Sequence, residues 1–303
     1  MVEKKLFTLK QDITDTMFST PKTPSKRIVY KDMIDSSVID PNVPSDDIFM
    51  DVPSKDKLVD STEEMVGEGD FFVVYRTRNN TVLKKSKSLV RNNLDREFYQ
   101  KEVNLLKNIV SPYITKYINS FTYQSHFYIE TEYCKLGTLR EYIDRVYNVE
   151  KSRISEEMIR KIMYDVSSGL RDIHLQDIVH LDIKPENIFI SGDYDSSDTW
   201  IFKIGDFGIS RYTGEDITLD GDKRYMGPEV LQNICTPSSD IFSLGLIYIE
   251  ILHGINLPKK GTPWQRLRKN DFRGIGMNKI LRRMLYSNYK KRCKAEDVVK
   301  YFV

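Results

Sequence analysis

The sequence has almost no net charge. Its 303 residues include 46 Lys and Arg against 44 Asp and Glu, which gives +2 at pH 7. Capture of nucleic acid by long-range electrostatics requires an excess of positive charge, so we expect no nucleic-acid partner. Three scattered cysteines, Cys134, Cys235 and Cys293, form neither a metal-site spacing nor an even-numbered disulfide framework. This favours a reducing, intracellular compartment.

Long apolar runs are also lacking. The most apolar stretch, 241–252, contains Ser243 and Glu250, and a membrane span needs about 20 apolar residues. The residues after Met1 are charged rather than apolar, so no signal peptide is expected. We therefore expect a soluble chain with no membrane partner.

Residues 1–60 lack glycine and tryptophan but hold five of the eleven prolines. Without a sustained apolar period, they are expected to form a mostly disordered regulatory tail. Within it, Thr23-Pro24 has the form of a proline-directed phosphorylation site, or of an ordinary linker, and Lys5-Leu6-Phe7 faintly resembles a cyclin-docking motif. All fifteen glycines lie from Gly67 onward, so we place the folded domain at 61–303.

The first part of this domain, about 61–134, is rich in strand patterns. Residues 71–75 and 81–84 predict a hairpin around Asn79-Asn80. Residues 94–109 predict a helix with Phe98, Leu105 and Ile109 on one face. Glu102 falls on that same face, where a carboxylate requires a partner.

From about 135 to 303 the pattern is mainly helical. Residues 159–173 follow the spacing of an amphipathic helix, and 241–252 is apolar nearly all round, as in a helix at a domain centre. Short strands are expected at 188–190 and 202–204. The fold class is therefore α+β: a small antiparallel sheet lobe with one helix precedes a larger, mainly helical lobe. The basic run 259–273 is interpreted as a solvated face, with substrate docking as the alternative.

Two features of the small lobe suggest phosphate chemistry. Gly67-Glu68-Gly69 lies between strand patterns, where glycines let backbone N–H groups approach phosphate oxygens. Lys84 and Lys85 are adjacent in a strand, so one of them points inward. Glu102 is the expected partner of the inward lysine.

The large lobe holds the most specific pattern. The run 180–187 reads HLDIKPEN, and Asp206-Phe207-Gly208 follows a second strand. Asp182, Asn187 and Asp206 supply hard oxygen ligands of the kind that Mg²⁺ prefers over zinc, and Lys184 adds a cation.

These residues together resemble the protein kinase family over about 65–303. The resemblance implies a bilobal kinase fold, with ATP and Mg²⁺ as cofactors. It implies that Asp182 is the catalytic base, that Lys184 steadies the γ-phosphate, and that Lys84, paired with Glu102, holds the α- and β-phosphates. Asn187 and Asp206 would bind the metal. The remaining residues expected around ATP are Val66, Gly67, Glu68, Gly69, Val74, Thr131, Glu132 and Cys134. Glu229 is expected to pair with Arg292, and Asp240 to anchor the central helix.

Two positions depart from the kinase pattern. Phe72 replaces the third glycine of the loop, where we expect a stiffer loop that keeps its backbone donors. Leu181 stands where many kinases have the arginine that pairs with a phosphorylated activation loop. We therefore expect activity without phosphorylation of Thr213, Thr218 or Tyr225.

Longer runs resemble the Wee/Myt-type mitosis-inhibitor kinases. They are HLDIKPENIFI, GDKRYMGPE at 221–229, and the segments around 240–246, 257–258 and 264–268. The resemblance implies a cyclin-dependent kinase with its cyclin as the protein substrate, modified on a tyrosine or threonine of its own Gly-rich loop. It also implies a nuclear location, with the cytoplasm as the alternative; we expect a monomer. Lys184 follows the serine/threonine pattern, whereas the family is known for tyrosine. A kinase of another family, such as the translation-initiation-factor kinases, and a pseudokinase scaffold are the alternatives.

Overall fold

The computed structural model describes residues 62–69, 71–217 and 221–303. They form two compact units, one made of 62–107 with 117–133 and the other of 108–116 with 134–303. The tail expected over 1–60, with its Thr23-Pro24 and Lys5-Leu6-Phe7 motifs, lies outside the described residues, as does Thr218.

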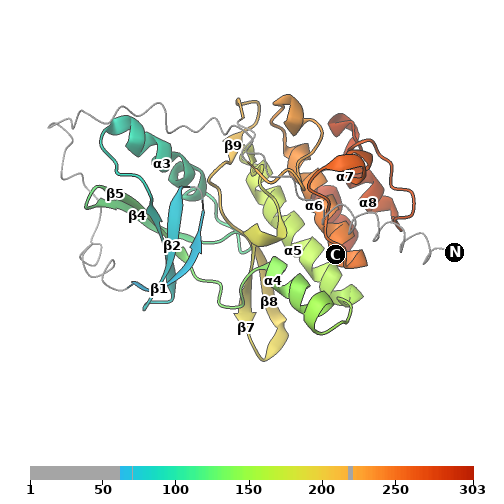
Figure 1. The fold of residues 1–303 in the computed structure, drawn as a ribbon, viewed down its shortest axis with the longest axis horizontal. Coiled ribbons are helices and arrows are strands. Elements are labelled where there is room, and N and C mark those ends of the chain that lie inside the picture. The colour runs from blue at the N-terminus through green and yellow to red at the C-terminus, as the bar shows by residue number, and fades with distance from the viewer. Residues whose placement is uncertain (1–61, 70, 218–220) are drawn as a thin grey trace. The chain divides into compact units, whose positions relative to one another are not determined.

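The N-terminal unit is an antiparallel sheet with one helix. The strand order is β1-β2-β3-β5-β4 (Figure 1). The strands are β1 (Thr62–Glu68), β2 (Phe72–Thr77), β3 (Thr81–Ser86), β4 (Tyr117–Tyr123) and β5 (His126–Glu132). The predicted hairpin is confirmed, and its turn places Asn80 at φ 56°, a left-handed conformation that asparagine tolerates.

The helix α3 (Asn93–Leu106) begins where Asn92 accepts a hydrogen bond from the backbone N–H of Asp95. It ends three residues before the predicted end. The predicted apolar face is confirmed at Leu105, which is buried, but was wrong at two positions. Phe98 is 48% exposed, and Ile109 lies beyond the end of the helix and is only partly buried. Tyr99 takes the buried position next to Phe98 and stacks on Phe127 of β5 with ring centroids 5.8 Å apart. Glu102 lies on the buried face, as predicted.

The C-terminal unit is mainly helical. Its helices are α4 (Leu139–Asp144), α5 (Glu156–His174), α6 (Pro237–His253), α7 (Gly261–Arg268), α8 (Lys279–Met284) and α9 (Ala295–Phe302), with short turns η2 (Arg145–Val149), η3 (Pro185–Asn187), η4 (Val230–Gln232) and η5 (Tyr289–Lys291). Two small antiparallel pairs accompany them: β6 (Ile178–Val179) with β9 (Arg211–Tyr212), and β7 (Ile188–Asp193) with β8 (Ser196–Ile204).

The core of this unit is built on α5 and α6, the two helices that the sequence pattern predicted. α6 is buried from Ser239 to Ile251, begins with Pro237 in its first turn and ends at Gly254, whose φ of 59° stops the helix. α5 contacts α6, β8 and α9. No helix in the described part of the chain has the length and apolarity needed to cross a membrane.

A short segment between α3 and β4 belongs to the C-terminal unit. Ile204 donates to the carbonyl of Tyr113 at 2.8 Å, and Thr115 donates to the carbonyl of Ile204 at 2.9 Å. These bonds join 108–116 to the end of β8 and help to fix the position of the loop that follows β8.

Candidate active site

The inward lysine of β3 is Lys84. It occupies a central position in the sheet, in register with Val74 of β2 and Ile129 of β5. Its Nζ lies 2.8 Å from Oε1 of Glu102, and the two side chains are 13% and 5% exposed. The predicted ion pair is thus present in the N-terminal unit. A buried pair of this kind fixes both side chains, because either charge alone would be costly.

The loop between β1 and β2 is closed by a hydrogen bond from Gly69 N–H to the Phe72 carbonyl at 2.9 Å. A Cβ on Gly67 would approach Val74 no closer than 3.8 Å, and neither Gly67 nor Gly69 has a left-handed φ. The fold itself therefore does not demand glycine here. The residues fit a site where a ligand approaches the backbone closely, as a phosphate chain would.

Phe72 takes a role in packing, which explains how the third glycine can be replaced. Its ring meets Tyr99 edge-on at 5.3 Å, and the preceding Phe71 meets Phe98 in the same way at 5.1 Å. The loop is therefore joined to α3, the helix that carries Glu102. The stiffening expected from the sequence has a physical basis in these contacts.

The remaining residues predicted around ATP lie in two places. Val66 is exposed on β1, where Glu68 is also exposed, and Thr131 is buried in β5 with Glu132 after it. Cys134 is buried and belongs to the C-terminal unit.

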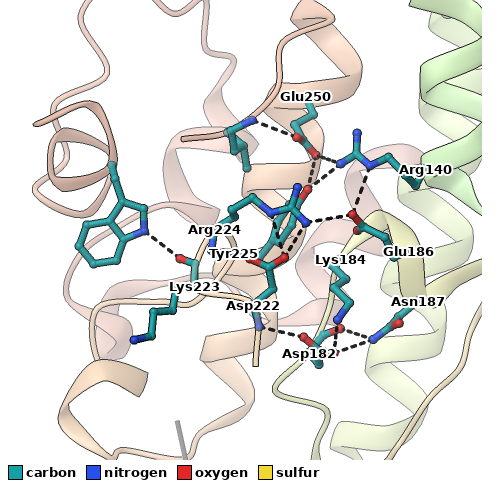
Figure 2. A network of polar contacts seen from close by, with 12 residues as sticks. Arg140, Asp182, Lys184, Glu186, Asn187, Asp222, Lys223, Arg224, Tyr225 and Glu250 are labelled. Carbon is teal, nitrogen blue, oxygen red and sulfur yellow. Dashed lines mark hydrogen bonds and ion pairs between the residues drawn. The ribbon is translucent and has the colours of Figure 1, made fainter. Parts of the chain in front are cut away.

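In the C-terminal unit, three groups converge on the carboxylate of Asp182 (Figure 2). Oδ2 accepts from Lys184 Nζ at 2.6 Å and from Asn187 Nδ2 at 2.9 Å, and Oδ1 accepts from the backbone N–H of Asp222 at 3.2 Å. Burial works against the charge of Lys184, but the adjacent Asp182 carboxylate raises the lysine pKa above its ordinary value. The lysine is therefore charged at neutral pH.

The β7–β8 pair brings the backbone of Asn187 next to Gly205, the residue before Asp206. Ile188 is in register with Ile204, and the next backbone bond runs from Gly205 N–H to the Asn187 carbonyl at 2.9 Å. The amide nitrogen of Asn187 donates twice to Asp182, so its amide oxygen remains the atom suited to a metal. The oxygen donors of Asn187 and Asp206 fit Mg²⁺.

His180 and Asp240 hold the backbone of the loop before Asp182. The buried carboxylate of Asp240 accepts from the backbone N–H groups of His180 and Leu181, both at 2.9 Å. These bonds support Leu181 at φ 68°, a strained conformation for leucine. His180 in turn packs against Phe207, with ring centroids 4.8 Å apart. The predicted anchoring role of Asp240 at the start of α6 is confirmed.

A polar network continues from Asp222, and the partners within it were not predicted from the sequence. Arg224 bonds both Asp222 and Glu186, at 2.6 and 3.0 Å. Arg140 bonds Glu250 and the hydroxyl of Tyr225, at 3.0 and 2.7 Å (Figure 2). Burial opposes the charge of Asp222, but its bonds from Arg224 hold the Asp222 pKa below the usual range. The run 221–229 stands out in the sequence only for its family resemblance, and a local run of residues names no distant partner.

The C-terminal end of the segment 221–229 is held by the expected ion pair between Glu229 and Arg292. Both side chains are buried, and the two Nη atoms lie 2.5 and 2.6 Å from the two carboxylate oxygens. The prediction of this pair is confirmed. A bidentate arginine fork of this kind fixes orientation as well as charge.

A comparison with known protein families agrees with this geometry. The family model of the protein kinase domain matches residues 61–302. The chain belongs to the protein kinase family. Its fold is the α+β kinase fold, as predicted, and a kinase domain generally uses ATP and Mg²⁺ and acts on a protein substrate.

Several relatives of this kinase are mitosis inhibitors. It is 32% identical over 234 residues to the mitosis inhibitor protein kinase SWE1 of Candida albicans, over 70% of this chain and 19% of that protein. It is 30% identical over 255 residues to a membrane-associated tyrosine- and threonine-specific cdc2-inhibitory kinase of Caenorhabditis elegans, over 78% of this chain and 36% of that one. A probable protein kinase of Dictyostelium discoideum is 33% identical over 252 residues, and the match covers 78% of this chain and 70% of that protein. The kinase thus spans only a fifth to a third of the two named inhibitors. The predicted resemblance to Wee-type kinases is confirmed.

Proposed function

We propose that this kinase is a negative regulator of mitotic entry that phosphorylates a cyclin-dependent kinase on the tyrosine, the threonine or both in that protein's Gly-rich loop. The observation that carries the proposal is the similarity to kinases named as mitosis inhibitors and as cdc2-inhibitory. Added phosphate charge beside the ATP of the target would misplace its nucleotide, which explains how such a modification inhibits.

The chain's own groups support phosphoryl transfer in the following way. Asp182, held by Lys184, Asn187 and the N–H of Asp222, is proposed to orient the substrate hydroxyl and accept its proton. Lys184 is proposed to neutralise charge on the transferred phosphate. When bound, Mg²⁺ on Asn187 and Asp206 would supply further neutralisation of phosphate oxygens.

The proposed roles for the rest of the nucleotide fall to residues of the N-terminal unit and to Cys134 of the C-terminal unit. Lys84, oriented by Glu102, is proposed to hold the α- and β-phosphates. The backbone of Gly67 and Gly69 is proposed to cover them, with Val66, Glu68 and Val74 beside it. Thr131, Glu132 and Cys134 are proposed to contact the adenine.

The test offers the purified chain Mg²⁺-ATP and a catalytically inactive cyclin-dependent kinase bound to its mitotic cyclin. Mass spectrometry then locates the phosphate, with Asp182→Asn as the control. We expect phosphate on the tyrosine or threonine of the target's Gly-rich loop, absent in the control.

Other results would separate the alternatives. Autophosphorylation without transfer to that loop would retain the kinase activity but refute the proposed substrate and favour a kinase of another family. No phosphate on either protein would favour a pseudokinase scaffold.

A further inference from the structure

Positive charge is concentrated in one part of the kinase. Residues 255–294 contain thirteen Lys and Arg and a single acidic residue, Asp271, which is a net charge of +12 in forty residues. Since the whole chain carries +2, the rest of it carries −10. The near-neutral total therefore hides a strong segregation of charge.

Internal partners account for only part of this charge. Asp271 is already bonded by Arg273 and Arg266, at 2.7 and 3.0 Å, and these arginines hold the Asp271 pKa below its usual range. Arg292 forms an ion pair with Glu229, and Arg268 donates hydrogen bonds to the carbonyls of Lys223 and Arg224. No carboxylate of this segment remains for the other cations.

Eight of the nine remaining cations are exposed, and none of these eight forms an ion pair with a carboxylate in the part of the chain that the structure describes. Five of them lie on segments that hydrogen bonds join, and we call these five the basic surface: Lys269, Lys279, Arg282, Lys290 and Lys291. Like charges held at one place repel one another unless a partner supplies the opposite charge.

Hydrogen bonds hold the segments of the basic surface side by side. Asn270 and Ser287 bond each other twice, at 2.9 and 3.2 Å, which joins the residue after Lys269 to the turn before η5. Cys293 N–H donates to the carbonyl of Arg283 at 3.4 Å, which joins the chain after η5 to α8. Within α8, Lys279 and Arg282 are three residues apart and so share a face.

The same chain contains a complementary segment. Residues 32–51 hold six aspartates and no lysine or arginine. The thirty residues from 32 to 61 can extend to about 100 Å, so their length does not limit where the segment reaches. Because the segment and the surface are parts of one molecule, their effective concentration is far above that of a free partner.

We propose that the basic surface binds an acidic polypeptide segment, and that this segment is residues 32–51 of the same chain. The proposal does not depend on the identity of the kinase substrate. Spaced aspartates would each meet a separate lysine or arginine, an arrangement in which exposed ion pairs act together as a network.

Zero-length carbodiimide cross-linking of the full-length chain tests this directly, because it joins a carboxylate to a lysine only when the two are in contact. We expect mass spectrometry to find links from Asp32–Asp51 to Lys269, Lys279, Lys290 or Lys291. Raising the salt to 0.5 M, where charge interactions extend only about 4 Å, should reduce these links about tenfold.

Arg282→Glu is the informative variant, since arginine itself does not form these links. It should reduce linking to the neighbouring lysines about threefold to tenfold by reversing one charge of the surface. Arg153→Glu, an exposed arginine of the same unit outside the basic surface, should leave the links unchanged. Mixing ¹⁵N-labelled and unlabelled chains identifies links within one molecule.

Three results would overturn the proposal. Links found only between labelled and unlabelled chains would make a second copy the occupant. Absence of links, together with binding of a 20-nucleotide RNA or of phosphatidylserine vesicles that Arg282→Glu weakens, would make the occupant a nucleic acid or a membrane. Links that persist equally in 0.5 M salt and in Arg282→Glu would show that charge does not hold the segment.

Discussion

The Glu229–Arg292 pair joins two residues that are 63 positions apart in the sequence. Replacing one member leaves the other buried with an uncompensated charge, which typically costs about 3–5 kcal/mol. We therefore expect Glu229→Gln to lower the free energy of unfolding by roughly that amount, as measured by urea denaturation.

Glu296→Gln is the matched control, since Glu296 pairs with Lys300 on the exposed face of α9. It should leave the free energy of unfolding nearly unchanged. Equal effects of the two substitutions would show that the burial of the Glu229–Arg292 pair does not contribute to the free energy of unfolding.

Phe72 supports the loop over the proposed phosphate site through its edge-on contact with Tyr99. Aromatic pairs of this geometry contribute about 0.5–1.5 kcal/mol beyond burial. Phe72→Gly restores the glycine common in kinases but loses this contact, so we expect the KM for ATP to rise about three- to tenfold with a smaller change in kcat. Phe72→Tyr keeps the ring and serves as the control. An unchanged KM for ATP in Phe72→Gly would mean that the contact does not position the loop.

At the scale of elements, the loop from His180 to Asn187 should make stability depend on pH. His180 is fully buried; its Nε2 lies 3.0 Å from the Gly205 carbonyl, and its Nδ1 lies 3.3 Å from the backbone nitrogen of Asp182. These partners require Nε2 to donate and Nδ1 to accept, as in a neutral ring. Burial lowers the His180 pKa, although the carboxylates of Asp240, Asp182 and Asp206 oppose the shift.

Because the folded pKa lies below the unfolded value of 6.5, the unfolded chain takes up the proton first as the pH falls. The stabilisation from a neutral His180 is thus complete above pH 6.5 and is lost below it, at up to about 1.4 kcal/mol per pH unit. Urea unfolding at pH 7.5, 6.5 and 5.5 should show that the free energy of unfolding falls less steeply with decreasing pH in His180→Asn than in the parent chain. Identical slopes would contradict this assignment.

The segment after β9 should need no phosphate. Leu181 is packed with Val179, Ile217 and Met226 in an apolar cluster that could not hold a phosphate-binding arginine. Tyr225 is 2% exposed and bonded to Glu250, so its hydroxyl is inaccessible to a kinase. We expect phosphatase treatment to leave kcat/KM within about twofold, because no phosphate orders this segment. A large loss, restored in Thr213→Glu, would refute this expectation.

The elements that could be predicted from the sequence are those with strong local signals. The apolar spacing of α5 and the continuous apolar stretch of α6 needed no tertiary information. The buried face of α3 could be found only with tertiary information, because Phe98 packs against Phe71 of the loop while Tyr99 takes the buried position. Arg140 bonds Glu250, 110 residues away, and Asp222 bonds Asp182, 40 residues away, so no periodic pattern could reveal these partners.

At the scale of the whole molecule, the three cysteines report on unfolding. Cys134, Cys235 and Cys293 are 6%, 5% and 3% exposed. Burial raises the pKa of the Cys235 and Cys293 thiols to about 11, so thiolate is scarce at pH 8 and reactivity is low. All three belong to the C-terminal unit, which makes them probes of that unit's cooperativity.

We expect iodoacetamide at pH 8 to leave all three thiols of the native chain unmodified. In rising urea, the three should become reactive together, at the midpoint seen by circular dichroism, because a residue buried in a cooperative unit is exposed only when that unit opens. Mass spectrometry of the alkylated peptides measures each site. Labelling of Cys235 well below the midpoint would instead show that the apolar cluster around Leu181 opens separately from the α5–α6 core.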